Sequence, residues 1–212
     1  RQRYKNMYTG MFYQRYILGQ WVMSEGLIYD MFDQTENIFQ KEEEPVGMRS
    51  VATRTIAIDY GTTNPMRFLD IWDDGSIVRV CDEYNWDSRK EHRQKTDKEY
   101  ADDFMDFMGE NYCAVIVDPS AASFITELRS RGVYVIPAEN EVLDGIRKTS
   151  TLIQQRKILV CDTCETVLDE MGVYMWDERA SLNGKEQPVK QNDHSLDALR
   201  YYVNYLPDWR FE

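Results

Sequence analysis

Three aspartates stand at positions where a carboxylate could bind a metal ion or take part in catalysis. Asp59 ends an alternating segment rich in β-branched residues, and Asp118 directly follows the apolar run 114–117. Asp197 comes three residues after His194 in a segment of helical periodicity, so these two side chains share one face of a helix. Acids that end the strands of an α/β sheet lie at its carboxyl edge, where ligands bind.

Carboxylates that converge at such an edge repel one another, and burial beside an apolar strand adds to the cost of their charge. Two divalent metal ions roughly 4 Å apart can neutralise them while activating a water and stabilising the leaving oxygen of a phosphodiester. Carboxylate ligands favour Mg²⁺ or Mn²⁺, and an imidazole among them favours Mn²⁺. The residue types therefore permit a two-metal site for phosphodiester cleavage.

Each acid also has a purely structural interpretation. An aspartate at the end of a strand is often a turn or cap residue, which would account for Asp59 or Asp118 taken singly. Asp193 is expected to be the N-cap of the last helix rather than a metal ligand. The polar sector of that helix, which includes Asp197 and Tyr201, lies opposite an apolar sector and could simply face solvent.

The elements that must position these acids alternate in the manner of a mixed α/β domain. The patterning predicts strands over residues 51–60, 66–72, 77–84, 114–117, 133–136 and 158–160, and helices over 96–108, 121–131, 144–156, 164–171 and 193–205. A turn signal at residues 73–76 (DDGS) makes the first three strands antiparallel. Asn183-Gly184, between Val173 and Val189, predicts a β-hairpin before the last helix. This order resembles the ribonuclease H-like fold, a central mixed sheet flanked by helices.

Length and composition indicate one globular domain with an appendage. The chain has 212 residues, of which 42% are hydrophobic and 29% charged. Residues 1–50 are expected to form a helix followed by extended pieces and a linker, which ends near the charged segment 41–45 (KEEEP). No apolar run approaches the roughly 18 residues that span a bilayer, and no signal peptide pattern is present, so a soluble intracellular protein or a soluble fragment of one is expected.

The charge and the cysteines exclude several classes of protein. The chain carries 25 basic and 37 acidic residues, a net charge of −12. That charge argues against a nucleic-acid coat or a membrane-surface binder, both of which need a positive field, but not against an enzyme that acts on DNA through bound metal. The four cysteines are too scattered for a disulfide framework, and Cys161 and Cys164 lack the second close pair of a structural zinc site.

Three stretches resemble the nuclease domain of the large terminase subunit of tailed bacteriophages. They are residues 58–61 (IDYG), 117–120 (VDPS) and 192–201 (NDHSLDALRY), and residues 19–29 and 143–146 fit the same family. The large subunit of that family packages DNA with an N-terminal ATPase and cuts the concatemer with a C-terminal nuclease. The chain has no G-x-x-x-x-G-K-[ST] motif. The resemblance therefore implies a ribonuclease H-like nuclease domain at residues 51–212, preceded by a remnant of the ATPase-side region at residues 1–50.

Carried over position by position, the resemblance makes Asp59, Asp118 and Asp197 catalytic metal ligands. His194 would be a further ligand or would lie near the scissile phosphate. The implied enzyme is a Mg²⁺- or Mn²⁺-dependent endonuclease that cuts concatemeric viral DNA during packaging, with two metal ions and little sequence specificity. Its products would carry 5′-phosphate and 3′-hydroxyl ends.

DNA binding would then depend on phosphate contacts, since no element is expected to enter a groove. The basic residues expected to contribute lie on and after the predicted helix 144–156 and around the predicted hairpin: Arg147, Lys148, Arg156, Lys157, Arg179, Lys185 and Lys190. The hairpin could act as a gate over the cleft. The resemblance also implies double-stranded DNA, the terminase ATPase domain, the small terminase subunit and the portal protein as partners, in the host bacterial cytoplasm. The isolated domain is expected to be monomeric.

Three other interpretations of the sequence remain. A junction resolvase or a transposase-like enzyme would use the same fold and the same acids. Residues 59–63 (DYGTT) also resemble the phosphate loop of actin-like ATPases, but those proteins need two such domains, and Pro119 stands where a second glycine turn is required. A non-catalytic interaction module, in which the acids serve only as caps, would bind no divalent metal.

Overall fold

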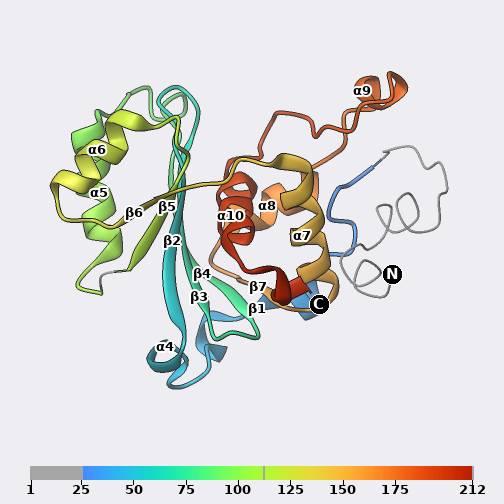
Figure 1. The fold of residues 1–212 in the computed structure, drawn as a ribbon, viewed down its shortest axis with the longest axis horizontal. Helices are drawn as coiled ribbons and strands as arrows, with labels where there is room; N and C mark the ends of the chain where they lie inside the picture. The colour runs from blue at the N-terminus through green and yellow to red at the C-terminus, as the bar shows by residue number, and fades with distance from the viewer. Residues whose placement is uncertain (1–25, 112, 212) are drawn as a thin grey trace.

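A seven-stranded sheet in the order β1-β7-β4-β3-β2-β5-β6 forms the centre of the computed structural model, which describes residues 26–111 and 113–211 (Figure 1). The strands are β1 (Ile38–Phe39), β2 (Thr53–Asp59), β3 (Met66–Asp73), β4 (Val78–Trp86), β5 (Ala114–Val117), β6 (Val135–Pro137) and β7 (Ile158–Cys161). β3 is antiparallel to both β2 and β4, and the remaining pairs are parallel. The carboxyl ends of β2, β4 and β5 therefore lie at the same edge of the sheet.

Helices cover both faces of the sheet. They are α3 (Gln34–Asn37), α4 (Met48–Val51), α5 (Asp97–Met108), α6 (Ala122–Ser130), α7 (Val142–Gln154), α8 (Glu165–Val173), α9 (Glu178–Leu182) and α10 (His194–Tyr205), with 3₁₀ helices at Lys41–Glu43 and Asp208–Phe211. Side chains that alternate along β2 pack on opposite faces: Ile56 and Ile58 share a core with Phe104 of α5, and Ala57 shares the other core with Leu199 of α10. Figure 1 shows α5 and α6 on one side and α7, α8 and α10 on the other.

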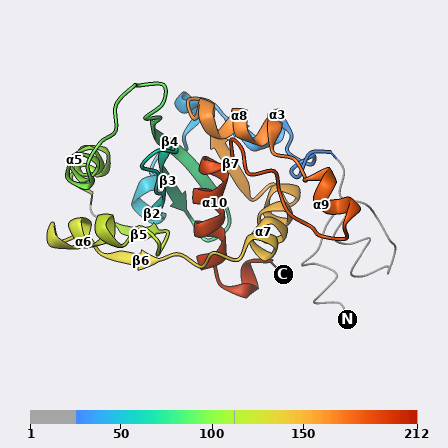
Figure 2. The same ribbon diagram turned by 90° about the horizontal axis from the view of Figure 1, so that it is seen from above.

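The mixed α/β fold with three antiparallel strands is confirmed, and every strand and helix predicted within residues 51–171 is present. The hairpin before the last helix is only partly right. Its arms are joined by an isolated antiparallel bridge between Trp176 and Pro188, but the tip contains the short helix α9, which lies away from the sheet (Figure 2). The Asp177 side chain caps this helix by accepting hydrogen bonds from the N–H groups of Arg179 and Ala180.

The described part of residues 1–50 contributes one short strand to the sheet and several side chains to the core. β1 pairs with β7 at the edge of the sheet, and Ile28 and Tyr29 are buried in the core. The fully buried Asn37 side chain donates hydrogen bonds to the carbonyl oxygens of Ile153 and Ile158 at 3.3 and 3.0 Å. The helix expected at the start of the chain lies outside the described residues.

None of the helices in residues 26–111 and 113–211 has the length and hydropathy of a membrane-spanning segment.

Candidate active site

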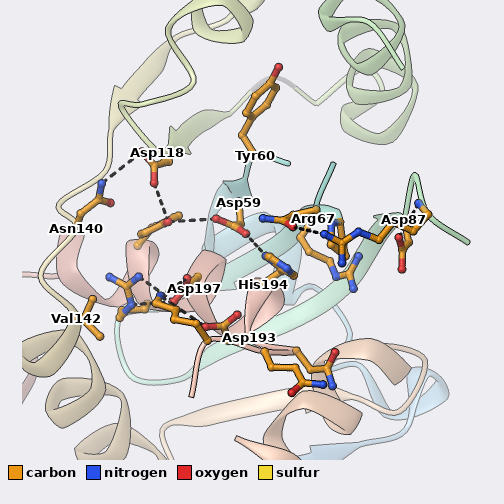
Figure 3. A pocket seen from close by; sticks show the side chains of 18 of the residues that line it. Asp59, Tyr60, Arg67, Asp87, Asp118, Asn140, Val142, Asp193, His194 and Asp197 are labelled. Carbon is orange, nitrogen blue, oxygen red and sulfur yellow. Dashed lines mark hydrogen bonds and ion pairs between the residues drawn. The ribbon is translucent and has the colours of Figure 1, made fainter. Parts of the chain in front are cut away.

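Asp59 and Asp118 lie side by side because their strands are adjacent and parallel. Asp59 is the last residue of β2, and Asp118 follows β5, which pairs with β2 as far as Ile58 and Val117. Both carboxylates accept hydrogen bonds from the Tyr201 hydroxyl of α10, at 3.2 Å for Asp59 and 3.0 Å for Asp118 (Figure 3). The structure thus brings together two of the predicted acids through a tyrosine to which the sequence assigned no role.

The polar sector of α10 faces this pair rather than solvent, so the solvent-facing interpretation is wrong. The Nδ1 atom of His194 lies 2.8 Å from Oδ2 of Asp59. Asp197 and Tyr201, one helical turn apart, are only 8% and 3% exposed. Together with Asp59 and Asp118, these residues line one cavity of about 610 Å³ at the carboxyl edge of the sheet.

Cations of the protein neutralise Asp197. Its Oδ1 accepts a hydrogen bond from Nη2 of Arg200 at 2.8 Å, and Nζ of Lys190 lies 3.5 Å from Oδ2. Gly145 of α7 makes room for the arginine, because a Cβ at this position would lie 2.4 Å from Cγ of Arg200. The close approach of α7 and α10 therefore depends on the glycine of the segment 143–146 that the sequence analysis singled out.

Asp193 occupies the N-cap position of α10, but its side chain makes no capping hydrogen bond, so that prediction is wrong for the side chain. Glu170 of α8 takes this role: its Oε2 accepts hydrogen bonds from the N–H groups of Ser195 and Leu196 at 2.7 and 3.2 Å. The Asp193 carboxylate, 4% exposed, instead lines the cavity and lies 3.6 Å from Lys190. It is a further acid available to the site.

Burial and mutual repulsion set the charge states of these acids. Burial raises the pKa of Asp59, and the charge of Asp197 adds to this, although the hydrogen bond with His194 opposes it. Burial and Asp197 likewise raise the pKa of Asp193. Burial also disfavours the charged form of Asp118, but hydrogen bonds from Ser120 and Tyr201 outweigh it and lower its pKa. Carboxylates whose charge is costly in this way are stabilised by an added cation.

The chemistry of this set of donors fits a hard divalent cation, because its members are carboxylate oxygens with one imidazole. In residues 26–111 and 113–211, no three His, Cys, Asp or Glu side chains stand close enough to hold one ion as they are. Groups of the protein hold the acids instead: Tyr201 bridges Asp59 and Asp118, and Lys190 lies beside both Asp193 and Asp197. Cys161 and Cys164 are both buried and free.

Of the seven basic residues predicted to contact DNA, Lys190 lines the cavity and the other six do not. Lys148 is paired with Asp144 at 3.1 Å. Arg156 donates hydrogen bonds to the carbonyl oxygen of Met31 and to Asn37, which ties the N-terminal segment to the domain. Arg147 and Lys157 are half-buried, and Arg179 and Lys185 are exposed around α9. The cavity contains other cations, Arg67, Arg89 and Lys90, that the sequence analysis missed.

Comparison with known proteins identifies relatives of this chain. No model of a protein family matches it. The large subunit of the terminase of Escherichia phage T5 is 28% identical over 193 residues, which cover 84% of this chain and 42% of the T5 protein. A large terminase from a thermophilic bacteriophage, whose structure was determined in complex with ADP, is 47% identical with a TM-score of 0.88. That match covers 97% of this chain and 51% of the ADP-bound terminase.

A third match is to an isolated domain. The large terminase nuclease of the thermophilic phage G20c, solved with bound magnesium, is 15% identical and superposes with a TM-score of 0.62. The match covers 87% of this chain and 97% of the G20c domain. This similarity shows that the two proteins share a fold. The chain spans about half the length of the ADP-bound terminase and less than half of the T5 protein. By sequence the chain is a homologue of part of the phage large terminases, and it has the fold of the G20c large terminase nuclease.

Proposed function

We propose that this chain is the nuclease domain of a phage large terminase and cuts double-stranded DNA with the help of Mg²⁺ or Mn²⁺. The observation that carries the proposal is the cavity shared by Asp59, Asp118, Asp197 and His194 at the carboxyl edge of the sheet. The 47% identity to the ADP-bound large terminase supports the same function. The magnesium bound by the G20c nuclease supports the choice of metal.

The three aspartates, with Asp193 beside them, would hold the metal. Divalent cations bound there would supply an activated water for in-line attack and would stabilise the 3′-oxygen that leaves. Asp59 orients the ring of His194 through Nδ1, which leaves Nε2 as the nitrogen available to a ligand or a phosphate oxygen. Tyr201 fixes the spacing of Asp59 and Asp118, and Arg200 and Lys190 balance the charge of Asp197.

We expect metal binding to tighten this arrangement, because within residues 26–111 and 113–211 no three of these side chains are close enough to hold one ion. The exposed side chain of Lys190 can move away from Asp197, whereas Arg200 is 3% exposed and is held against Gly145. Arg200 therefore stays beside Asp197 as a fixed positive charge.

The relatives also support a proposal for the biological setting. We assign residues 51–212 to the nuclease domain and residues 1–50 to the region that joins it to a terminase ATPase domain. Its substrate would be concatemeric viral DNA, cut with little sequence preference in the host bacterial cytoplasm. The partners would be that ATPase domain, the small terminase subunit and the portal protein.

Cleavage of supercoiled plasmid in Mn²⁺, Mg²⁺ or EDTA tests the proposed function. We expect nicking and linearisation with either metal and none in EDTA. The variants Asp59→Ala, Asp118→Ala and Asp197→Ala should each lose about 100-fold or more in rate, since each removes a charged ligand of the cation that stabilises the transition state. Asp106→Ala, at an exposed aspartate of α5, is the matched control. A parent protein that is inert with both metals, or folded variants that cut as well as the parent, would refute the proposal.

A further inference from the structure

Two cations of the cavity take no part in the arrangement of acids described above. Arg89 and Lys90 belong to the segment 87–96, which connects β4 to α5. Both side chains are exposed, and both line the cavity that holds Asp59 and His194.

The topology of the sheet places this segment beside the acids. β4 runs parallel to β2, because both are antiparallel to β3. Within the sheet Asn85 is aligned with Arg67, and Arg67 with Asp59, so β4 ends level with Asp59. In Figure 3, Asp87 lies on the opposite side of His194 from Asp118. The segment therefore forms one wall of the cavity, and Asp118 lies toward the other.

The segment is held in place by its own contacts. The Ser88 hydroxyl, in a residue only 7% exposed, donates a hydrogen bond to the carbonyl oxygen of Thr62 at 3.0 Å. The N–H of Arg93 donates to the carbonyl oxygen of Ser88 at 3.1 Å, and Nε1 of Trp86 donates to that of Arg93 at 3.2 Å. These bonds tie the segment to itself and to the loop between β2 and β3, so its backbone is already ordered before a ligand binds.

Carboxylates do not neutralise these two cations in the described part of the chain. Arg89 makes a side-chain contact with the neutral amide of Asn64, at 3.3 Å, and no ion pair within residues 26–111 and 113–211 involves Lys90. By contrast, Arg93 is paired with Glu99, Arg200 with Asp197, and Lys190 with Asp193 and Asp197. In a chain of net charge −12, two such cations at the lining of the acidic cavity are suited to an anionic ligand.

We propose that Arg89 and Lys90 bind backbone phosphates of duplex DNA next to the phosphate that is cut. This inference rests on the proposed function and adds the direction in which the substrate lies. The bound strand passes Asp59 toward the segment between β4 and α5. The bound strand does not lie along α7 or the segment around α9, where most of the basic residues predicted from the sequence are found. The two side chains offset the repulsion between the phosphates and the aspartates.

The test measures binding of a fluorescein-labelled duplex by anisotropy in Ca²⁺, over a range of salt concentrations. We expect the double variant Arg89→Ala/Lys90→Ala to bind about 10-fold or more weakly than the parent. Its slope of log affinity against log salt should be shallower by about 1.8, because two phosphate contacts are lost. Lys98→Ala, at an exposed lysine of the adjoining helix α5, is the matched control and should bind as the parent does. Unchanged melting temperatures would show that the variants are folded.

The outcomes for the two proposals are distinguishable. A double variant with the affinity and salt slope of the parent would overturn the role of Arg89 and Lys90, and the nuclease function would stand if the parent still cuts plasmid. A parent that binds DNA through these residues but cuts nothing with either metal would instead refute the proposed function. An equal loss of affinity in Lys98→Ala would also overturn the inference, because the effect would then be one of net charge.

Discussion

At the scale of single residues, the Tyr201 hydroxyl joins two carboxylates that belong to different strands. It has one proton to donate and two acceptors within 3.2 Å, so Asp59 and Asp118 must share it. Sequence periodicity correctly placed Tyr201 with Asp197 on one face of a helix. It could not assign the hydroxyl its partners, which lie 142 and 83 positions away in the chain. The contact depends on how the sheet and α10 pack together.

His194 provides a test of the site that does not depend on activity. Burial lowers its pKa, but the hydrogen bond and the charge of Asp59, together with Asp193 and Glu170, outweigh this and raise the pKa above 6.5. Since the pKa is higher in the folded state, the charged imidazole stabilises the fold below pH 6.5, and this contribution is lost as the pH rises above that value. We expect the imidazole signal in an NMR titration of the protein in EDTA to have its midpoint above pH 6.5.

The assignment is simple because the chain has two histidines. The other histidine, His92, has an exposed side chain, and the variant His92→Gln removes its imidazole signal. Asp59→Asn should lower the midpoint of His194, since it removes the nearest negative charge. A midpoint for His194 below 6.5, or one that Asp59→Asn leaves unchanged, would show that the pair does not form in solution.

At the scale of elements, α8 holds the start of α10 through a single side chain. Glu170 is 3% exposed, caps α10 through Ser195 and Leu196, and lies 3.6 Å from the buried Arg67. Glu170→Ala would leave two helix N–H groups without their partner and Arg67 without its opposite charge. We expect the free energy of unfolding, measured in urea, to fall by about 3 kcal/mol.

The neighbouring Asp169 is the matched control, because it lies on the same helix and makes none of these contacts in the described structure. Asp169→Ala should change the free energy of unfolding by less than about 0.5 kcal/mol. Equal effects of the two variants would mean that Glu170 does not cap α10.

Most elements could be predicted because their residues alternate with the period of a strand or a helix. β2 alternates between two cores, and β5 is a continuous apolar run that the structure buries. The prediction failed where one side chain decides the local structure. The Asp177 side chain caps a helix within the predicted hairpin, and Glu170 rather than Asp193 caps α10. A distant residue that takes over a cap has no signature in the local sequence.

At the scale of the whole molecule, the net charge of −12 opposes the proposed substrate. The isolated domain should therefore bind duplex DNA weakly, and in the terminase that we propose a tethered motor domain would supply the DNA at high local concentration. We expect the rate of plasmid cleavage to fall about tenfold or more between about 50 and about 200 mM salt, because phosphate contacts release counterions. Submicromolar binding at physiological salt, or cleavage indifferent to salt, would contradict this expectation.

β1 bears on how far the protein can be shortened from its N-terminus. The patterning of the sequence favours a boundary near residue 51, but β1 covers the outer edge of β7. A protein that starts at residue 51 would leave the backbone N–H and C=O groups of β7 open to solvent, together with the apolar surface that Ile28 and Tyr29 cover. Exposed strand edges of this kind pair with other chains. Such a shortened protein would keep every acid of the cavity and would nevertheless tend to aggregate.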